Sequence, residues 1–178
     1  MAVRLKKFQR VFYEVDGFSL EVREAKPADA KRLWEIQRQK KVNNFLLFSS
    51  YSFEKYKKRF LSRLRDFDGK TVVAALDGIV IGRAFLKLGR GRASHVANFG
   101  IFIDEGFQGK GIGRILMREL FNYAKSIGVE KLEDEAFSDN KRALRFYKKL
   151  GFRIEGVRKR KFVRDGRHFD SVLIGKFL

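Results

Sequence analysis

Hydrophobic residues follow two different periods along this chain, and each period predicts one kind of secondary structure. Apolar residues three or four positions apart indicate amphipathic helices, and this spacing predicts helices over about 27–44, 52–67, 111–126 and 140–150. Short apolar runs joined by Asp-Gly pairs, which favour hairpin turns, predict strands instead. The expected strands lie at 11–15, 18–24, 71–76, 79–88, 95–103, 129–137, 153–163 and 168–178.

The order of these elements predicts an α/β fold with a mixed sheet. Hairpins force antiparallel pairs, whereas strands joined through a helix favour parallel ones. No linker, internal repeat or low-complexity segment divides the chain, so we expect one domain over 1–178. It should hold a central sheet of about six to seven strands, flanking helices and a C-terminal hairpin. Residues 1–17 are expected to form an N-terminal extension that adds a strand to the sheet.

Composition narrows the chemistry. The 178 residues are 44% hydrophobic, enough for a sizeable core, and they include no cysteine. Disulfides, thiolate nucleophiles and sulfur-ligated metals are therefore excluded. Two histidines are too few for a His-rich centre, so we expect no metal. No apolar run approaches the roughly 18 residues of a membrane span, and the basic N-terminus lacks the apolar core of a secretory signal. We expect a cytoplasmic protein without membrane contact.

Charge is the least ordinary property of the sequence. Forty Lys and Arg against 21 Asp and Glu give a net charge of +19. Such a balance indicates either a polyanionic partner, nucleic acid above all, or a solvated basic surface. The basic residues are spread from Arg4 to Lys176, which favours the second interpretation and leaves contact with nucleic acid open.

A glycine-rich segment at 101–114 carries the most specific chemistry. Gly109, Gly111 and Gly113 stand between an expected strand and an expected helix. Glycine permits a close approach of the backbone to a ligand, and a helix N-terminus binds phosphate. An ordinary strand-to-helix turn is the alternative. The spacing matches neither GxxxxGK(S/T) nor GxGxxG, which disfavours an NTPase and a dinucleotide dehydrogenase.

Three motifs resemble one known family. Residues 108–113, QGKGIG, resemble the pyrophosphate-binding loop, (Q/R)-x-x-G-x-(G/A), of the GNAT superfamily of N-acetyltransferases. Residues 140–152 resemble the N-x-x-A-x-x-x-Y-x-x-x-G-F helix of the same family. The tail at 155–170 is similar to the closing hairpin of the branch with ribosomal-protein and polyamine acetyltransferases.

The resemblance implies a single-domain GNAT-like fold that binds acetyl-CoA. By analogy, the strand ending at 101–103 pairs with the pantetheine arm and the amides of 108–114 hold the pyrophosphate. Asn140 would lie beside the sulfur, and Tyr147 would act as general acid toward the leaving thiolate; a core aromatic is the alternative for Tyr147. The implied cofactor residues are Ile101, Phe102, Ile103, Gln108, Gly109, Lys110, Gly111, Ile112, Gly113, Arg114, Asn140 and Tyr147.

The general base is less well defined. Many relatives carry Glu near the position of Asn98, and an amide cannot accept a proton at neutral pH. Asn98 could instead hold a water in a relay. Asp134 shares the strand parity of Leu132 and Ala136, so it is a base candidate whose pKa burial would raise. A solvated or salt-bridged carboxylate is the alternative. His95 follows a turn and is expected at the surface.

The function implied by the resemblance is acetyl transfer from acetyl-CoA to a primary amine, directly within a ternary complex. A protein or peptide N-terminus or a lysine, including one on a ribonucleoprotein, is the first expected acceptor and a small amine the second. The basic hairpin at 158–167 disfavours cationic polyamines if it faces the acceptor. Residues 44–53 either line the acceptor site or pack the early helices. A basic nucleic-acid-binding protein on the same fold is the alternative function, and a homodimer remains open.

Overall fold

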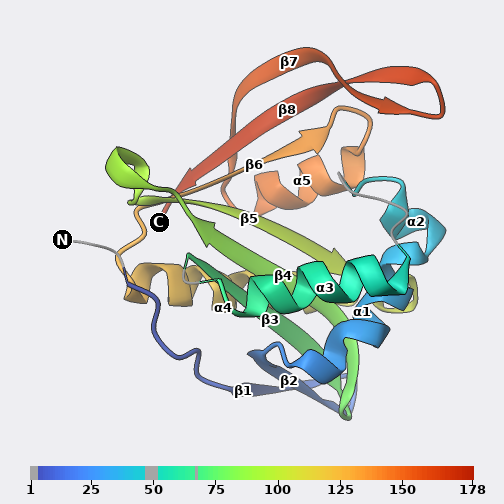
Figure 1. Cartoon of the computed structure of the whole chain (residues 1–178), viewed down its shortest axis with the longest axis vertical. Coiled ribbons are helices and arrows are strands. Elements are labelled where there is room, and N and C mark those ends of the chain that lie inside the picture. The colour runs from blue at the N-terminus through green and yellow to red at the C-terminus, as the bar shows by residue number, and fades with distance from the viewer. Residues whose placement is uncertain (1–3, 47–51, 67) are drawn as a thin grey trace.

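One eight-stranded sheet organises the molecule (Figure 1). The computed structural model describes residues 4–46, 52–66 and 68–178. The strand order is β1-β2-β3-β4-β5-β6-β8-β7. The strands are β1 Val11–Val15, β2 Phe18–Glu24, β3 Gly69–Leu76, β4 Ile79–Leu88, β5 Val96–Ile103, β6 Lys131–Phe137, β7 Arg153–Arg164 and β8 Arg167–Phe177. The sheet exceeds the expected six to seven strands because both terminal hairpins pair within it, β1 and β7 forming its two edges.

The three Asp-Gly turns predicted from the sequence join hairpins. Asp16-Gly17, Asp77-Gly78 and Asp165-Gly166 all have positive φ at both residues, which matches the right-handed twist of the strands they connect. The sheet is antiparallel except where β5 runs parallel to β6. The prediction of a mixed α/β sheet is therefore confirmed.

Helices cover both faces of the sheet. They are α1 Ala30–Arg38, α2 Lys40–Asn43, α3 Phe53–Leu64, α4 Ile112–Ser126 and α5 Lys141–Lys149, with 3-10 turns at Pro27–Asp29, Gly91–Ala93 and Glu105–Phe107. The single helix expected over 27–44 is broken at Gln39, whose ψ of 133° is extended. Its side chain bonds to Asp104 and to the backbone of Glu105, and these tertiary contacts interrupt the helix.

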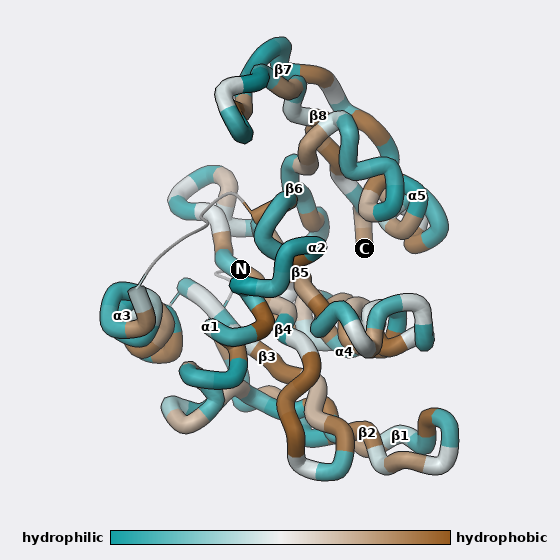
Figure 2. The backbone as a smooth tube through the Cα atoms, turned by 90° about the vertical axis from the view of Figure 1, so that its right-hand side faces the viewer, coloured by the Kyte–Doolittle hydropathy of each residue, from teal (hydrophilic) through white to brown (hydrophobic). Residues whose placement is uncertain are grey.

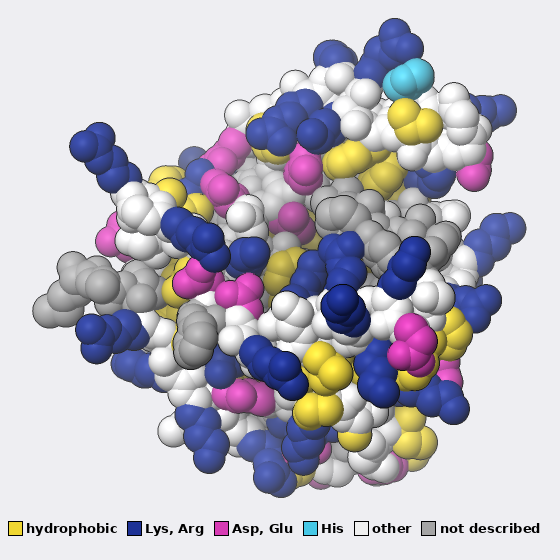
Figure 3. Space-filling model, viewed as in Figure 1, with side chains coloured by type: hydrophobic (Ala, Val, Ile, Leu, Met, Phe, Trp, Pro, Cys, Tyr) yellow, Lys and Arg dark blue, Asp and Glu magenta, His cyan; other side chains and the backbone are white. Residues whose placement is uncertain are grey.

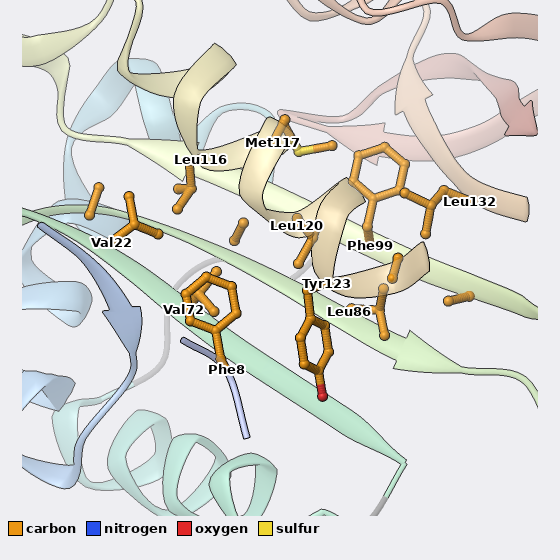
Figure 4. Close-up of a cluster of buried hydrophobic side chains, with 14 of the residues drawn as sticks. Phe8, Val22, Val72, Leu86, Phe99, Leu116, Met117, Leu120, Tyr123 and Leu132 are labelled. Atoms are coloured by element: carbon orange, nitrogen blue, oxygen red, sulfur yellow. The ribbon is translucent and has the colours of Figure 1, made fainter. Parts of the chain in front are cut away.

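Two hydrophobic clusters fill the two layers. In the larger one, Leu116, Met117 and Leu120 of α4 pack toward the sheet beside Phe99 and Leu132 (Figure 4). The smaller cluster lies beneath α1 and α3, which Figure 2 shows on the side of the sheet opposite α4. Apolar residues at helical spacing thus meet the alternating strand residues on both faces, as the pattern predicts.

The sheet opens between β5 and β6. These strands pair only at Val96–Asn98 with Lys131–Glu133, although β5 continues to Ile103 and β6 to Phe137. Past Asn98 the edge of β5 that faces β6 has no strand partner. The divergence leaves a cavity at this point of the fold.

Candidate acetyl-transfer site

The cavity between β5 and β6 has a volume of about 920 Å³. Its walls come from the diverging ends of both strands, the glycine loop, α5 and β4. Residues of α2 and α3, which lie on the other face of the sheet, also contribute. It gathers most of the residues singled out in the sequence. These are Ile101, Phe102, Ile103, Gln108, Gly109, Gly111, Gly113, Arg114, Asp134, Asn140 and Tyr147.

The glycine loop has the backbone geometry of an anion site. Gly109 and Gly111 have φ of +90° and +80°, values that disfavour any residue with a Cβ. Gly111 is the N-cap of α4 and offers no side-chain cap, so the first N–H groups of the helix remain for a ligand. A Cβ added to Gly111 would meet no atom within 4 Å. The loop therefore faces open space.

The side chain of Gln108 stabilises this loop through two hydrogen bonds. Its Nε2 donates to the carbonyl of Ile103 over 2.9 Å, and its Oε1 accepts from Arg142 over 2.7 Å. The side chain so connects the loop to β5 and α5. Two other predicted cofactor side chains lie elsewhere: Lys110 is positioned over the ring of Phe107, and Ile112 is buried in the core.

Tyr147 lies inside the cavity with 7% of its surface exposed. Its ring centroid is 5.5 Å from that of Phe99 and 5.6 Å from that of Phe152. Burial, with a smaller contribution from the charge of Asp134, raises the pKa of Tyr147 far above its usual value. The phenol is therefore protonated at neutral pH and can donate. The ring packs as a core aromatic, and its position in the cavity also leaves it accessible to a ligand.

Asp134 lies one residue past the last β5–β6 pair and lines the same cavity. The pKa of Asp134 is raised to about 7, mainly by burial. The hydrogen bond from the backbone N–H of Glu135 opposes this shift, and the negative charge of the Glu135 carboxylate adds to it. A carboxyl group with this pKa can take up and release a proton at neutral pH. Glu135 itself accepts from Ser171 over 2.6 Å and pairs with Arg158.

Asn140 and Asn98 occupy different environments. Asn140 caps α5, its Oδ1 accepting from the N–H of Ala143 over 3.1 Å, and it lines the cavity. No described residue accepts a hydrogen bond from its amide nitrogen. Asn98 is exposed, reaches the carbonyl of Glu133 over 3.4 Å and does not line the cavity. The geometry therefore gives a water relay through Asn98 no support, and His95 is exposed as expected.

Comparison with known proteins decides the family. The model of the acetyltransferase (GNAT) family matches residues 30–152, more than half of the chain. The chain belongs to the GNAT family. It is an acetyl-CoA-dependent N-acetyltransferase, as its motifs predict.

Two curated relatives and one solved structure illustrate the range of this family. The chain is 38% identical over 117 residues to the L-amino acid N-acetyltransferase AaaT of Escherichia coli, covering 64% of this chain and 72% of that protein. It is 24% identical over 146 residues to the ribosomal protein bS18 alanine N-acetyltransferase of Salmonella typhimurium, covering 82% and 89%. The crystal structure of the ribosomal-protein-alanine N-acetyltransferase of Brucella melitensis superposes with a TM-score of 0.78 at 26% identity, covering 88% and 99%.

This N-acetyltransferase has a second cavity wall that no motif predicts. It carries the arginines Arg59 and Arg63 of α3 and Arg83 of β4, together with Tyr56 and Phe85. One signal in the sequence points to it: Arg83 interrupts the apolar run over 79–86 of a strand. A charged residue in a strand with this pattern is either exposed at an edge or buried for a purpose, and here it is only 5% exposed.

The basic hairpin is less open to ligands than its composition indicates. Lys159 pairs with Asp170, and Arg158 pairs with Glu135. Arg164 bonds to Asp139 and to the carbonyl of Asn44, and its guanidinium lies 4.2 Å from the ring centroid of Phe169. The hairpin is thus fastened to the rest of the GNAT domain by some of its own cations.

Of the segment at 44–53, residues 47–51 lie outside the described residues. Phe45 and Leu46 line the cavity, and the ring of Phe45 also contacts that of Phe137, 6.2 Å between centroids. Leu46 also packs against the cluster beneath α1 and α3, so the first residues of this segment both line the cavity and contact the core; acceptor binding by the segment stays a prediction. Among the described residues no helix has the length and apolarity to cross a membrane. Over 4–46, 52–66 and 68–178 no cluster of three His, Asp or Glu is placed to hold a metal.

Proposed function

We propose that the protein acetylates a primary amine by direct transfer from acetyl-CoA within a ternary complex, with Asp134 as base and Tyr147 as acid. One observation carries the assignment. Where β5 and β6 diverge, a carboxyl group of pKa about 7 and a protonated phenol line one cavity that ends at the glycine loop. A proton acceptor and a proton donor are the two groups that this reaction requires.

Two backbone features suit the donor. The helix N-terminus at Gly111 would hold the pyrophosphate through backbone N–H groups and the helix dipole. The edge of β5 beyond Asn98 lacks a strand partner, so its backbone would hydrogen-bond the amide-containing arm as an added strand does. Arg114 and Arg142 line the cavity beside the loop, and their positive charges would complement the phosphates.

The proposed step assigns one proton to each side chain. Bound acetyl-CoA supplies a thioester whose carbonyl carbon the amine attacks, so that an N–C bond forms and the C–S bond breaks. Asp134 accepts the proton that the amine loses. Tyr147 donates its proton to the departing sulfur, or a hydrogen bond that stabilises the thiolate. Asn140, which lines the cavity, would hydrogen-bond the ligand through its amide nitrogen.

The acceptor is a primary amine, on a free amino acid or at the N-terminus or a lysine of a peptide or protein. Of the relatives described above, one is an L-amino acid N-acetyltransferase and one a ribosomal-protein alanine N-acetyltransferase. The alternative function, nucleic-acid binding without transfer, rests on charge. Lys and Arg side chains are spread over the face shown in Figure 3, with Asp and Glu among them, and this favours a solvated surface over one polyanion site.

Calorimetric titration with acetyl-CoA at moderate salt tests the cofactor site, together with an assay of CoA release in the presence of amines. Gly111→Glu should weaken binding at least 30-fold, because it adds strain and a negative charge where phosphate is expected. Gly17→Glu is a matched control: Gly17 has φ +78° and, like Gly111, no atom within 4 Å of an added Cβ. It should bind acetyl-CoA as the wild type does. Equal binding by both variants would show that the loop is only a turn.

A further inference from the structure

Arg83 is a buried cation whose role neither the fold nor the transfer step explains. It lies in the middle of β4 and is 5% exposed. Its guanidinium carbon is 4.9 Å from the ring centroid of Phe102 and 5.4 Å from that of Phe85. No described residue accepts a hydrogen bond from its Nε. A buried charge that no anion neutralises can destabilise a fold by several kcal/mol, so a ligand that supplies an anion would stabilise it.

No carboxylate of the chain neutralises this charge. Among the described residues none forms an ion pair with Arg83, whereas the buried Arg23 pairs with Asp29 over 2.8 Å. Residues 1–3, 47–51 and 67 contain no Asp or Glu. Burial lowers the pKa of Arg83 to about 10; the interaction with Tyr56 opposes this shift, and the positive charge of Arg63 adds to it. The side chain nevertheless stays positively charged at neutral pH.

A second unsatisfied donor lies near Arg83. Tyr56 is 6% exposed, lines the cavity, and its hydroxyl has no hydrogen-bond partner among the described residues. Arg63 lies over the ring of Phe85, 5.1 Å from its centroid, and Arg59 lines the same wall. The acidic lining residues, Asp134 and Glu135, are both on β6. The cavity thus has arginines on the wall formed by β4 and α3, while the carboxylates that line it are on β6; α5 contributes further cations.

We propose that Arg83 binds a carboxylate of the acceptor, so that the substrates are amines that also carry a carboxylate group. This inference rests on the proposed function and adds the acceptor class to it. The fork of N–H groups on a guanidinium matches the two oxygens of a carboxylate. Such an acceptor places its anionic end at Arg83 and Tyr56 and its amine toward Asp134. A free amino acid and the N-terminus of an acidic peptide both have this chemistry.

Acceptor specificity tests the inference. The twenty L-amino acids are screened with acetyl-CoA, and the best acceptor is compared with its own α-carboxamide. The peptide Ala-Asp-Ala-amide is compared with Ala-Asn-Ala-amide, so that a peptide source of the carboxylate is distinguished from a free amino acid. We expect the wild type to prefer the carboxylate member of one pair at least tenfold in kcat/KM, the size expected of a charge-assisted hydrogen bond.

Variants at Arg83 test whether this residue causes the preference for a carboxylate. Arg83→Met should reduce it to within about twofold, and Arg83→Lys should retain part of it. Arg92→Met, an exposed arginine outside the cavity, is the control and should keep it. Wild-type enzyme that acetylates both members of each pair equally, or Arg83→Met with an unchanged preference, would overturn the inference and leave the proposed function intact.

A binding measurement separates the two proposals further. With CoA present, the preferred carboxylate should raise the Tm of the wild type, its carboxamide should not, and neither should raise the Tm of Arg83→Met. Failure of every amine to be acetylated would contradict the proposed function. Absence of any carboxylate-dependent shift, with amines acetylated regardless of charge, would contradict the inference alone.

Discussion

The two walls of the cavity differ in which parts of the sequence form them. The wall beside the glycine loop comes mainly from one run of sequence, the end of β5, the loop and the start of α4. The later helix α5 completes this wall. The wall that carries Arg83 combines β4 with α3, and these belong to separate segments of the chain. The first wall is fixed largely by backbone geometry, with positive φ at Gly109 and Gly111. The second is fixed by side chains that only tertiary packing brings together.

The two walls also differ in how the burial of their side chains affects the stability of the fold. Tyr147 gains packing with Phe99 and Phe152 and stays neutral, so its burial stabilises the fold and is compatible with the role proposed for it. Arg83 remains charged, lies over the rings of Phe85 and Phe102, and has no ion-pair partner among the described residues and no acceptor for its Nε. Functional sites frequently retain such unfavourable groups because the ligand completes them. The comparison therefore predicts that variants of the two walls change activity and stability in different directions.

The largest effect is expected at Tyr147. Tyr147→Phe keeps the ring contacts and removes the donor, so kcat should fall by roughly 10²- to 10⁴-fold, the usual range for one acid–base group. Binding of acetyl-CoA should change little. Steady-state rates of CoA release, together with calorimetric Kd values, provide the measurement.

Tyr123→Phe is the matched control for that variant. Tyr123 is also a buried tyrosine, but its hydroxyl bonds to the backbone of Lys6 in the core, away from the cavity-lining residues. Its loss should cost stability of about 1 kcal/mol and leave kcat unchanged. A Tyr147→Phe enzyme as active as this control would remove the acid assignment.

Asp134 gives the next largest effect, expressed as a pH dependence. Its carboxyl group must be deprotonated to accept a proton, and its pKa is about 7. With the donor bound, kcat/KM should therefore fall about tenfold for each pH unit below 7. Asp134→Asn should lose most of the activity and this limb of the profile. An unchanged profile would assign the base to another group.

The same shift predicts a change in stability. The folded-state pKa is raised from 3.8 to about 7, so the folded protein holds this proton more tightly than the unfolded chain. Its contribution to stability consequently declines as pH rises from about 4 to about 7. Asp134→Asn removes the decline, and the variant should gain roughly 1–3 kcal/mol over the wild type at pH 8. Urea unfolding at pH 5 and pH 8 measures the difference.

More of the wall beside the glycine loop than of the wall that carries Arg83 could be predicted from the sequence. The glycine loop, the α5 motif and the position of Asp134 on the same strand face as Leu132 and Ala136 could be recognised from the sequence. Each of these features depends on residues that are near one another in the chain. The break at Gln39 could not be predicted, since it depends on bonds to Asp104 and Glu105 more than sixty residues away. Asn98 was singled out by family analogy alone, and its exposure shows that a position can match while its environment does not.

The smallest expected effect would sharpen the contrast between the walls most. Methionine follows the arginine side chain as far as Nε and carries no charge, so Arg83→Met keeps the apolar stem and removes the buried cation. Replacing a buried charge by an apolar side chain of similar volume is often stabilising, by about 1–3 kcal/mol. We therefore expect a higher Tm for Arg83→Met in the absence of ligand, a few degrees for a chain of this length. Arg23→Met is the matched control, because Arg23 is buried but paired with Asp29; its loss leaves a buried carboxylate unpaired and should lower the Tm. A lower Tm for both variants would show that Arg83 is a structural residue, stabilised by its aromatic neighbours rather than reserved for a ligand.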